Sequence, residues 1–422
     1  MRIILLTFLV AIPLHAADEL KAPLQSAADA AFQRVVTAPV PNLDTAVKCM
    51  QAEAMLFAVA APEETPLVAF RRAYCTLDNA AAAHDSAAFE TAAEAFDDAI
   101  ANAQGASAKQ KSSQSLAPVN REAPSAWRVL AAVARLNGGA SLESQEKNLE
   151  AAVDGMGYPD CQSYAGTPNF CQGVKQLGSA WLGRIALSKD DLTTAARRFD
   201  SSDAKPWKDF VAGVQSFERR NYSDAVEREQ RAIIDWRATQ QQSLLERISP
   251  QPSMTDALTD WGGAQLASGN TSAALTNLDA AIKLDGANGR ALYLRGVAKQ
   301  RSGRSDAAAD DFNLASRAAL AKASDTGSAE AHFYRGVALF ARKEFARAED
   351  EFSSAMNTDS ESRWQADARA WRLLAAVNAG ACGASRESLL KALAGVSPFF
   401  PRNDATASAG ACPTTAAVFP AK

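Results

Sequence analysis

The chain has 422 residues, of which 47% are hydrophobic and 22% are charged. These proportions are those of folded globular proteins and exclude wholesale disorder, while the length suits two or three domains or one solenoid. The 44 Lys and Arg against 48 Asp and Glu give a net charge of −4. This weak acidity argues against a nucleic-acid-binding surface and against a basic membrane-binding patch.

Residues 1–16 have the pattern of a cleavable secretory signal. One basic residue precedes an apolar run over 3–14, and the small residues Ala16 and Ala17 follow. The run is shorter than the about 20 residues that a membrane-spanning helix needs, so a retained anchor is the less favoured alternative. We expect cleavage after Ala16 and export without stable membrane insertion, to the periplasm of a Gram-negative bacterium or as a secreted protein.

The six cysteines are even in number, which in an exported chain favours disulfides over free thiols. They form no CxxC motif and no zinc-ligand spacing. The alternative is six buried, unpaired thiols. The disulfides predicted between neighbours along the chain are Cys49–Cys75, Cys161–Cys171 and Cys382–Cys412.

Most of the chain after the leader has apolar residues at spacings of three and four, which is typical of helices. A polar stretch and a Gly- and Pro-containing stretch interrupt this pattern. The predicted segments are a signal peptide (1–16), an N-terminal helical segment with a degenerate repeat (17–103), a flexible linker (104–125), degenerate helical repeats (126–254) with a Cys-stapled loop (155–173), well-matched repeats (255–360), a terminal helix pair (361–395) and a C-terminal tail (396–422).

Small and apolar residues recur at a fixed period in the second half of the chain. The first copy carries Gly262, Gly269, Ala274, Leu278 and Ala281. Their equivalents 34 residues later are Gly296, Gly303, Ala308, Phe312 and Ala315. A third copy, whose first glycine follows 40 residues after that of the second, carries Gly336, Phe345, Ala348, Phe352 and Ala355.

This pattern resembles the tetratricopeptide repeat, a helix–turn–helix unit of 34 residues. Glycine and alanine would allow the paired helices to approach closely, and the Leu or Phe would fill the space between successive pairs. Weaker copies begin at Gly183 and Gly213; ordinary helical hairpins are the alternative for these. The expected fold is all-α, an α-solenoid of stacked tetratricopeptide-like repeats that form a right-handed superhelix.

The sequence offers no catalytic constellation. After the leader it contains two histidines, His84 and His332, which cannot form an HExxH motif, and we expect His332 to be a core or rim residue. Two SxxK matches, at 144–147 and 388–391, lack the companion motifs of acyl-transfer enzymes. We expect no enzyme, no metal site and no cofactor.

The resemblance implies that the first helix of each pair lines a concave groove that binds partner peptides. The residues expected there are Trp207, Phe210, Phe217, Arg290, Tyr293, Arg301, Phe333 and Phe340. Aromatic residues with some positive charge are typical of interface hot spots; the alternative is that these rings fill the core.

The predicted function is an exported protein–protein interaction scaffold whose partner is an unidentified protein or peptide. The alternatives are a helical protein that binds a small ligand or glycan in the same groove, and an enzyme of unrecognised type. The sequence makes no prediction of the oligomeric state.

Overall fold

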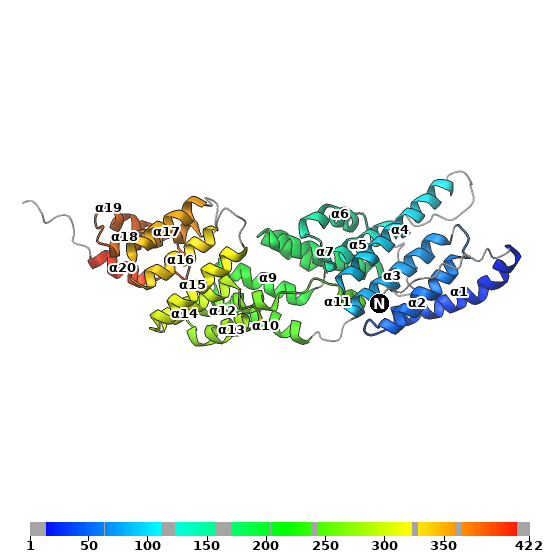
Figure 1. Ribbon diagram of the computed structural model, residues 1–422, viewed down its shortest axis with the longest axis horizontal. Helices are drawn as coiled ribbons and strands as arrows, with labels where there is room; N and C mark the ends of the chain where they lie inside the picture. Colours follow the sequence, from blue (N-terminus) through cyan, green and yellow to red (C-terminus); the bar gives the residue numbers. More distant parts are fainter. Residues whose placement is uncertain are drawn as a thin grey trace, which may run out of the picture. The chain divides into compact units, whose positions relative to one another are not determined.

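The computed structural model describes residues 14–62, 64–110, 123–156, 170–202, 204–238, 243–322, 328–358 and 364–411. Over these residues the chain forms helices and no strand (Figure 1). The helices are α1 (Leu14–Val36), α2 (Leu43–Phe57), α3 (Thr65–Ala83), α4 (Ser86–Gln110), α5 (Ala123–Asn137), α6 (Leu142–Asp154), α7 (Phe170–Ser188), α8 (Leu192–Ser202), α9 (Lys205–Glu218), α10 (Tyr222–Ala238), α11 (Leu244–Arg247), α12 (Met254–Ala267), α13 (Thr271–Leu284), α14 (Gly289–Arg301), α15 (Ser305–Lys322), α16 (Ala329–Ala341), α17 (Phe345–Thr358), α18 (Gln365–Asn378), α19 (Ala384–Ala392) and α20 (Arg402–Ala411).

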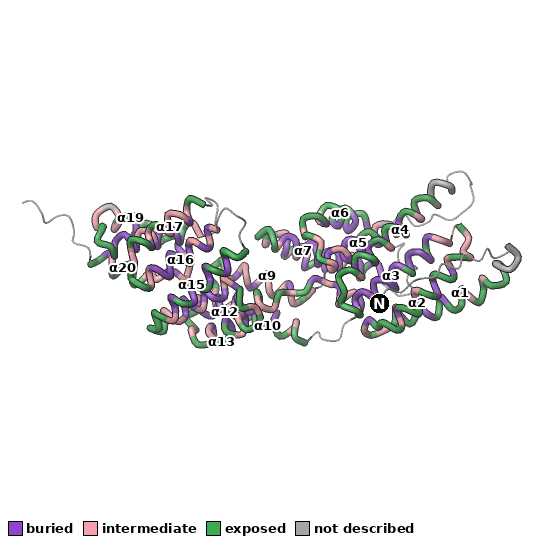
Figure 2. The backbone as a smooth tube through the Cα atoms, viewed as in Figure 1, coloured by how far each residue is buried: buried purple, intermediate pink, exposed green. Residues whose placement is uncertain are grey.

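The helices form two compact units. Unit 1 comprises the described residues up to Val211 together with 236–251, and unit 2 comprises 212–235 and the described residues from Pro252 onward. Within each unit successive helices pack against one another and bury one face, which Figure 2 shows in purple. The predicted all-α solenoid of helix pairs is confirmed. None of the helices in the described ranges combines the length and apolar character that a membrane span requires.

Three boundaries differ from the sequence prediction. Residues 104–110, the start of the predicted linker, continue helix α4, because alanine, glutamine and lysine favour helix. The predicted tail contains α20, whose Ala405 and Ala409 lie one turn apart and are both buried. The end of the predicted stapled loop, 170–173, belongs to α7. Residues 1–13 of the predicted signal lie outside the described residues, as do 111–122 and 412–422.

Close contact between paired helices is built on the repeat glycines. A Cβ added at Gly262 would lie 2.7 Å from the side chain of Leu278, and one added at Gly296 would lie 2.5 Å from the ring of Phe312. Gly336 faces the Phe352 ring in the same way, at 2.6 Å. The weaker copy at Gly183 has the same geometry, since an added Cβ would lie 2.9 Å from the Phe199 ring. Glycine is therefore required for the partner side chain to fit.

One predicted disulfide is present in full. Cys49 on α2 and Cys75 on α3 are bonded, with their Cα atoms 5.9 Å apart. Cys171 and Cys382 are also disulfide-bonded. Their predicted partners, Cys161 and Cys412, lie outside the described residues, so those two pairings stay predictions.

Unit 1 contains a buried charge pair beside this disulfide. Glu53 on α2 is 0% exposed, and its Oε1 lies 2.7 Å from Nη2 of Arg71 on α3. Arg71 also contacts Asp29 at 2.7 Å and lies over the ring of Phe32. Burial raises the pKa of Glu53 from 4.5 to about 7, although Arg71 opposes the shift. The desolvation of the carboxylate thus outweighs its ion pair.

This shift predicts a pH dependence of stability. The native state binds a proton on Glu53 more tightly than the unfolded state, so the free energy of unfolding of unit 1 should fall as pH rises from 4.5 to about 7. The difference in pKa corresponds to about 3 kcal/mol across that window. Glu53→Gln should remove this component in urea unfolding measured at several pH values. Parallel pH profiles of the wild type and the variant would contradict the assignment.

The glycine contacts predict a position-specific effect of one added methyl group. Gly296→Ala should lower the free energy of unfolding by about 1–3 kcal/mol, because the Phe312 ring must move. Gly410→Ala, in helix α20, is the matched control, since an added Cβ there has nothing within 4 Å. Denaturant unfolding should show the control unchanged or slightly stabilised. Equal effects at the two positions would refute the packing role.

Candidate protein-binding face

Two of the predicted groove residues are part of the core of unit 2. Tyr293 on α14 and Phe333 on α16 are each 0% exposed, and their ring centroids are 5.6 Å apart. Trp364, at the start of α18, stacks on Phe333 at 4.8 Å. The prediction that these two rings line a partner groove therefore does not hold in this structure. They lie three residues before the repeat glycines, where the close approach of the helices directs them toward the next pair.

The predicted groove residues of unit 1 form an aromatic cluster. Trp207 on α9 is 5% exposed, stacks on Phe199 and donates a hydrogen bond from Nε1 to the Pro250 carbonyl at 2.9 Å. Phe210 is half-buried against Trp236. Because its ring is covered and its N–H is used internally, Trp207 is a core residue rather than a groove residue. A recess of about 460 Å³ borders it and is lined in part by Trp236.

Arg290 takes part in a half-buried cluster of charges. Its guanidinium lies 2.5 Å from Asp260 on α12. Glu229 on α10 is 2% exposed, and burial raises its pKa well above its usual range. Asp260 raises that pKa further, while Arg290 opposes both effects. The predicted groove residue Arg290 is thus paired with Asp260, while 38% of its side chain stays exposed.

Glu229 stands where the other repeats have Leu or Phe. An added Cβ at Gly213 would lie 2.8 Å from Glu229 Cγ, which is the contact that Gly296 makes with Phe312. The sequence analysis missed this residue. The signal was a carboxylate sixteen residues after the repeat glycine, at a position that otherwise holds an apolar side chain.

Phe340 is half-buried near the C-terminal end of α16. Its ring lies 5.1 Å from Phe345 and 4.9 Å from Trp371 on α18. These contacts join three helices, so most of the ring is used in packing between pairs.

Phe217 and Arg301 contact another part of the same chain. We call residues 396–401, between α19 and α20, the covering segment. Phe217 on α9 stacks on Phe399 with ring centroids 6.0 Å apart. Arg301, at the end of α14, donates to the Pro398 carbonyl at 2.5 Å and to the Leu266 carbonyl at 2.7 Å. Two predicted groove residues thus already hold a peptide segment.

Asp367 on α18 is the polar anchor of the covering segment. Its Oδ1 accepts a hydrogen bond from the Ser397 amide at 2.7 Å, and its Oδ2 accepts one from the Ser397 hydroxyl. Burial raises the pKa of Asp367, while both bonds from Ser397 lower it. Next along the segment, Phe400 is 2% exposed and packs against Trp371 at 5.2 Å.

A recess of about 520 Å³ lies beside the covering segment. Val297, Gln300 and Arg301 of α14 form one side, and residues 398–404 form the other. We call the surface that the covering segment contacts the inner face of unit 2. It is formed by α9 from Ala212 on, α12, α14 and α18, which are all first helices of their pairs.

Asp367, Ser397 and Phe399 are not among the residues predicted from the sequence. The available signal was local: the run Val396–Pro401, VSPFFP, places two adjacent aromatic rings between prolines in a segment without helical period. Aromatic side chains in a polar tail indicate that the tail packs against the folded part of the protein. The tail residues do not indicate which helices they contact.

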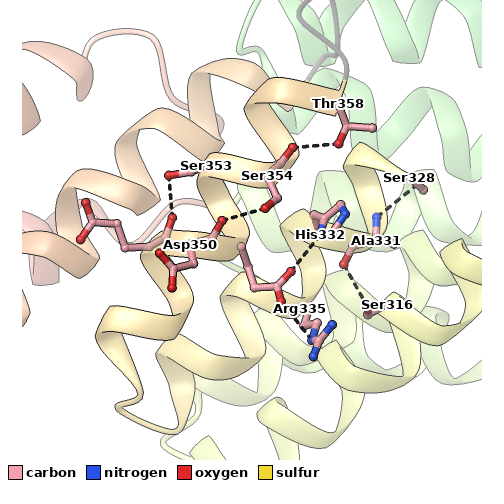
Figure 3. A network of polar contacts seen from close by, with 11 residues as sticks. Ser316, Ser328, Ala331, His332, Arg335, Asp350, Ser353, Ser354 and Thr358 are labelled. Carbon is pink, nitrogen blue, oxygen red and sulfur yellow. Dashed lines mark hydrogen bonds and ion pairs between the residues drawn. The ribbon is translucent and has the colours of Figure 1, made fainter. Parts of the chain in front are cut away.

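A second group of polar contacts lies between α16 and α17. His332 and Arg335 of α16 both reach the Glu351 carboxylate, at 2.8 Å and 3.3 Å (Figure 3). Ser316 of α15 donates to the Ala331 carbonyl at 2.9 Å in the same network. These bonds tie three successive helices together, and His332 is half-buried at the rim, as predicted.

The polar groups of the inner face of unit 2 contact a segment of the same chain. Among the described side chains no group of three or more His, Cys, Asp or Glu could hold a metal ion. On the inner face, Asp367 and Arg301 serve as acceptor and donor for a peptide backbone and a hydroxyl. Asp367 and Arg301 thus bind polar atoms of the segment, and Phe217 contacts its aromatic ring.

The paired helices, the 34-residue spacing and the glycine-to-ring contacts decide the architecture. The helix pairs pack like tetratricopeptide repeats. No protein-family model and no curated sequence matches it.

Three solved structures are similar in arrangement. The Cut9–Hcn1 hetero-tetramer of the APC/C has a TM-score of 0.42 at 12% identity, over 94% of this chain and 94% of that chain. A STAND ATPase with a tetratricopeptide repeat sensor from Pyrococcus horikoshii has a TM-score of 0.38 at 13% identity, over 90% of this chain and 64% of that chain. Yeast Tom70 has a TM-score of 0.33 at 8% identity, over 93% of this chain and 96% of that chain. The assignment of the repeat depends on the helix packing described above.

The burial of Phe333 predicts a large loss of stability on truncation. Phe333→Ala should lower the free energy of unfolding by about 3–5 kcal/mol, as expected for a core aromatic. Leu284→Ala is the control, because Leu284 on α13 is 60% exposed and should cost less than about 0.5 kcal/mol. Thermal or urea unfolding checks both. A Phe333 variant as stable as the wild type would return this ring to the list of groove candidates.

Proposed function

We propose that the chain is an exported protein–protein interaction scaffold that binds a segment of a partner protein on the inner face of unit 2. Stacked helical repeats use extended surfaces formed by successive repeats for such binding. The observation that carries the proposal is the covering segment, which is bound by first helices of several pairs through Phe217, Arg301 and Asp367. This face is therefore suited to holding a peptide.

Export to the periplasm is supported by two observations. Residues 1–16 have the pattern of a secretory signal. The Cys49–Cys75 disulfide agrees with an oxidising compartment, since disulfides persist there and are rare in the cytosol. Removal of the leader after Ala16 is part of the proposal.

We propose that the protein acts by binding, without catalysis. The polar groups of the inner face are main-chain hydrogen-bonding partners, and the Arg290–Asp260 pair is internal. A small ligand or glycan is the less supported alternative. The recess of unit 1 would suit such a ligand, yet the Trp207 ring beside it is almost fully covered.

Site-specific photo-crosslinking in native cells tests the proposal. A crosslinking residue at Gln300, which lines the recess of the inner face, should give a protein adduct in the periplasmic fraction. The same crosslinking residue placed at Asn313 of α15, which lines another recess of unit 2, is the matched control and should give no adduct. The adduct at position 300 should weaken when Arg301 is replaced by Ala.

Adducts of equal yield at both positions would contradict a specific inner-face site. The absence of any protein adduct at Gln300, with a small molecule copurifying instead, would favour the small-ligand alternative.

A further inference from the structure

The covering segment is a locally ordered turn. The Phe400 amide donates to the Ser397 carbonyl at 3.3 Å, and Pro398 is the second residue of this turn, where proline is favoured. The Phe399 amide also donates to the Ser397 hydroxyl at 3.3 Å. The segment thus presents a hydroxyl, a carbonyl and an aromatic ring in fixed directions.

The turn contacts the first helices of four different pairs. Phe399 stacks on Phe217 of α9, and its ring would lie 3.7 Å from a Cβ added at Gly263 of α12. Its neighbours bind Arg301 of α14 and Asp367 of α18. A segment held by the first helices of four pairs occupies a surface that several repeats share.

The segment divides into an anchor and a more accessible part. Phe400 is buried against Trp371 and belongs to the core. Ser397, Pro398 and Phe399 are only half-buried, and Pro398 and Phe399 border the recess. The half-buried part lies between two buried residues, Val396 at 1% and Phe400 at 2% exposure.

We propose that residues 397–399 are an intramolecular ligand of the inner face, and that the partner carries a proline turn of the same chemistry. This inference rests on the proposed function and specifies its ligand. The partner residue equivalent to Ser397 is Ser or Thr, because Asp367 accepts from both an amide and a hydroxyl. A proline whose carbonyl binds Arg301 follows, and then an aromatic residue for the slot between Phe217 and Gly263.

Self-occupancy sets the affinity. A tethered ligand has a high effective concentration, so a partner binds only to the fraction of molecules in which the turn has left. The chain therefore selects partners whose turn fits better than its own, or that make additional contacts in the recess beside Gln300.

A peptide supplied in trans tests this proposal. The probe is a fluorescein-labelled peptide with the sequence of residues 395–402, and its binding to the full chain is measured by fluorescence anisotropy. Ser397→Ala combined with Phe399→Ala removes the hydroxyl and ring of the internal turn and leaves Phe400 intact. This opened variant should bind the probe about tenfold or more tightly than the wild type does.

Two controls define the site. A probe that carries alanine in place of Phe399 should bind neither chain. Arg301→Ala in the opened variant should weaken binding of the intact probe, because the Pro398 carbonyl loses its donor. Should the double variant unfold, Phe399→Ala alone keeps the Asp367 bonds of Ser397 and replaces it in the same assay.

A folded opened variant that does not bind the probe would overturn the proposal and make the turn a purely structural element. Equal affinity of the probe for both chains would also overturn it. Light scattering that shows a dimer which monomerises in the opened variant would overturn the intramolecular assignment in favour of exchange between two copies. Probe binding without any Gln300 adduct in cells would support residues 397–399 as an intramolecular ligand and count against the proposed scaffold function. Adducts without probe binding would do the reverse.

Discussion

The contact between a glycine on one helix and a large side chain on the next is the constraint on which the rest of the structure depends. Gly262, Gly296 and Gly336 each leave room for a Leu or Phe from the second helix of the pair. An added methyl group would lie under 3 Å from that side chain in every case. Because paired helices approach this closely, the residues one turn before each glycine point into the neighbouring pair, and Tyr293 and Phe333 become core.

The repeat positions explain why the fold could be predicted from the sequence. Periodic glycines and apolar residues report local packing, and local packing defines the helix pairs. Pairing of cysteines that are neighbours along the chain predicted the Cys49–Cys75 disulfide, which joins α2 and α3. Periodicity does not tell which face of a first helix is solvated. The resemblance to the tetratricopeptide repeat placed Tyr293 and Phe333 in a groove, whereas both are buried. Helix α14 contacts the Phe312 ring of α15 at Gly296 and the Phe333 ring of α16 through Tyr293.

The inner face could be predicted only in part. Phe217 and Arg301 were identified from their repeat positions, and both are among its contact residues. Asp367 and the covering segment could not be found in this way, because their contacts join parts of the chain that are distant in sequence and follow no period. Glu229, by contrast, could have been found from the repeat. It occupies the position that faces the repeat glycine, where the other repeats have Leu or Phe, so a carboxylate there indicates a buried charge.

The central claim is that the turn at 397–399 is bound to the inner face in the free protein. Hydrogen–deuterium exchange of the wild-type chain tests it most directly, since the Ser397 amide is held by Asp367 and the Phe400 amide by the turn itself. The account predicts that these amides exchange slowly, and that Asp367→Asn accelerates exchange at Ser397 while α14 and α16 stay protected. Exchange of the wild-type segment at the rate of an unstructured peptide would contradict it.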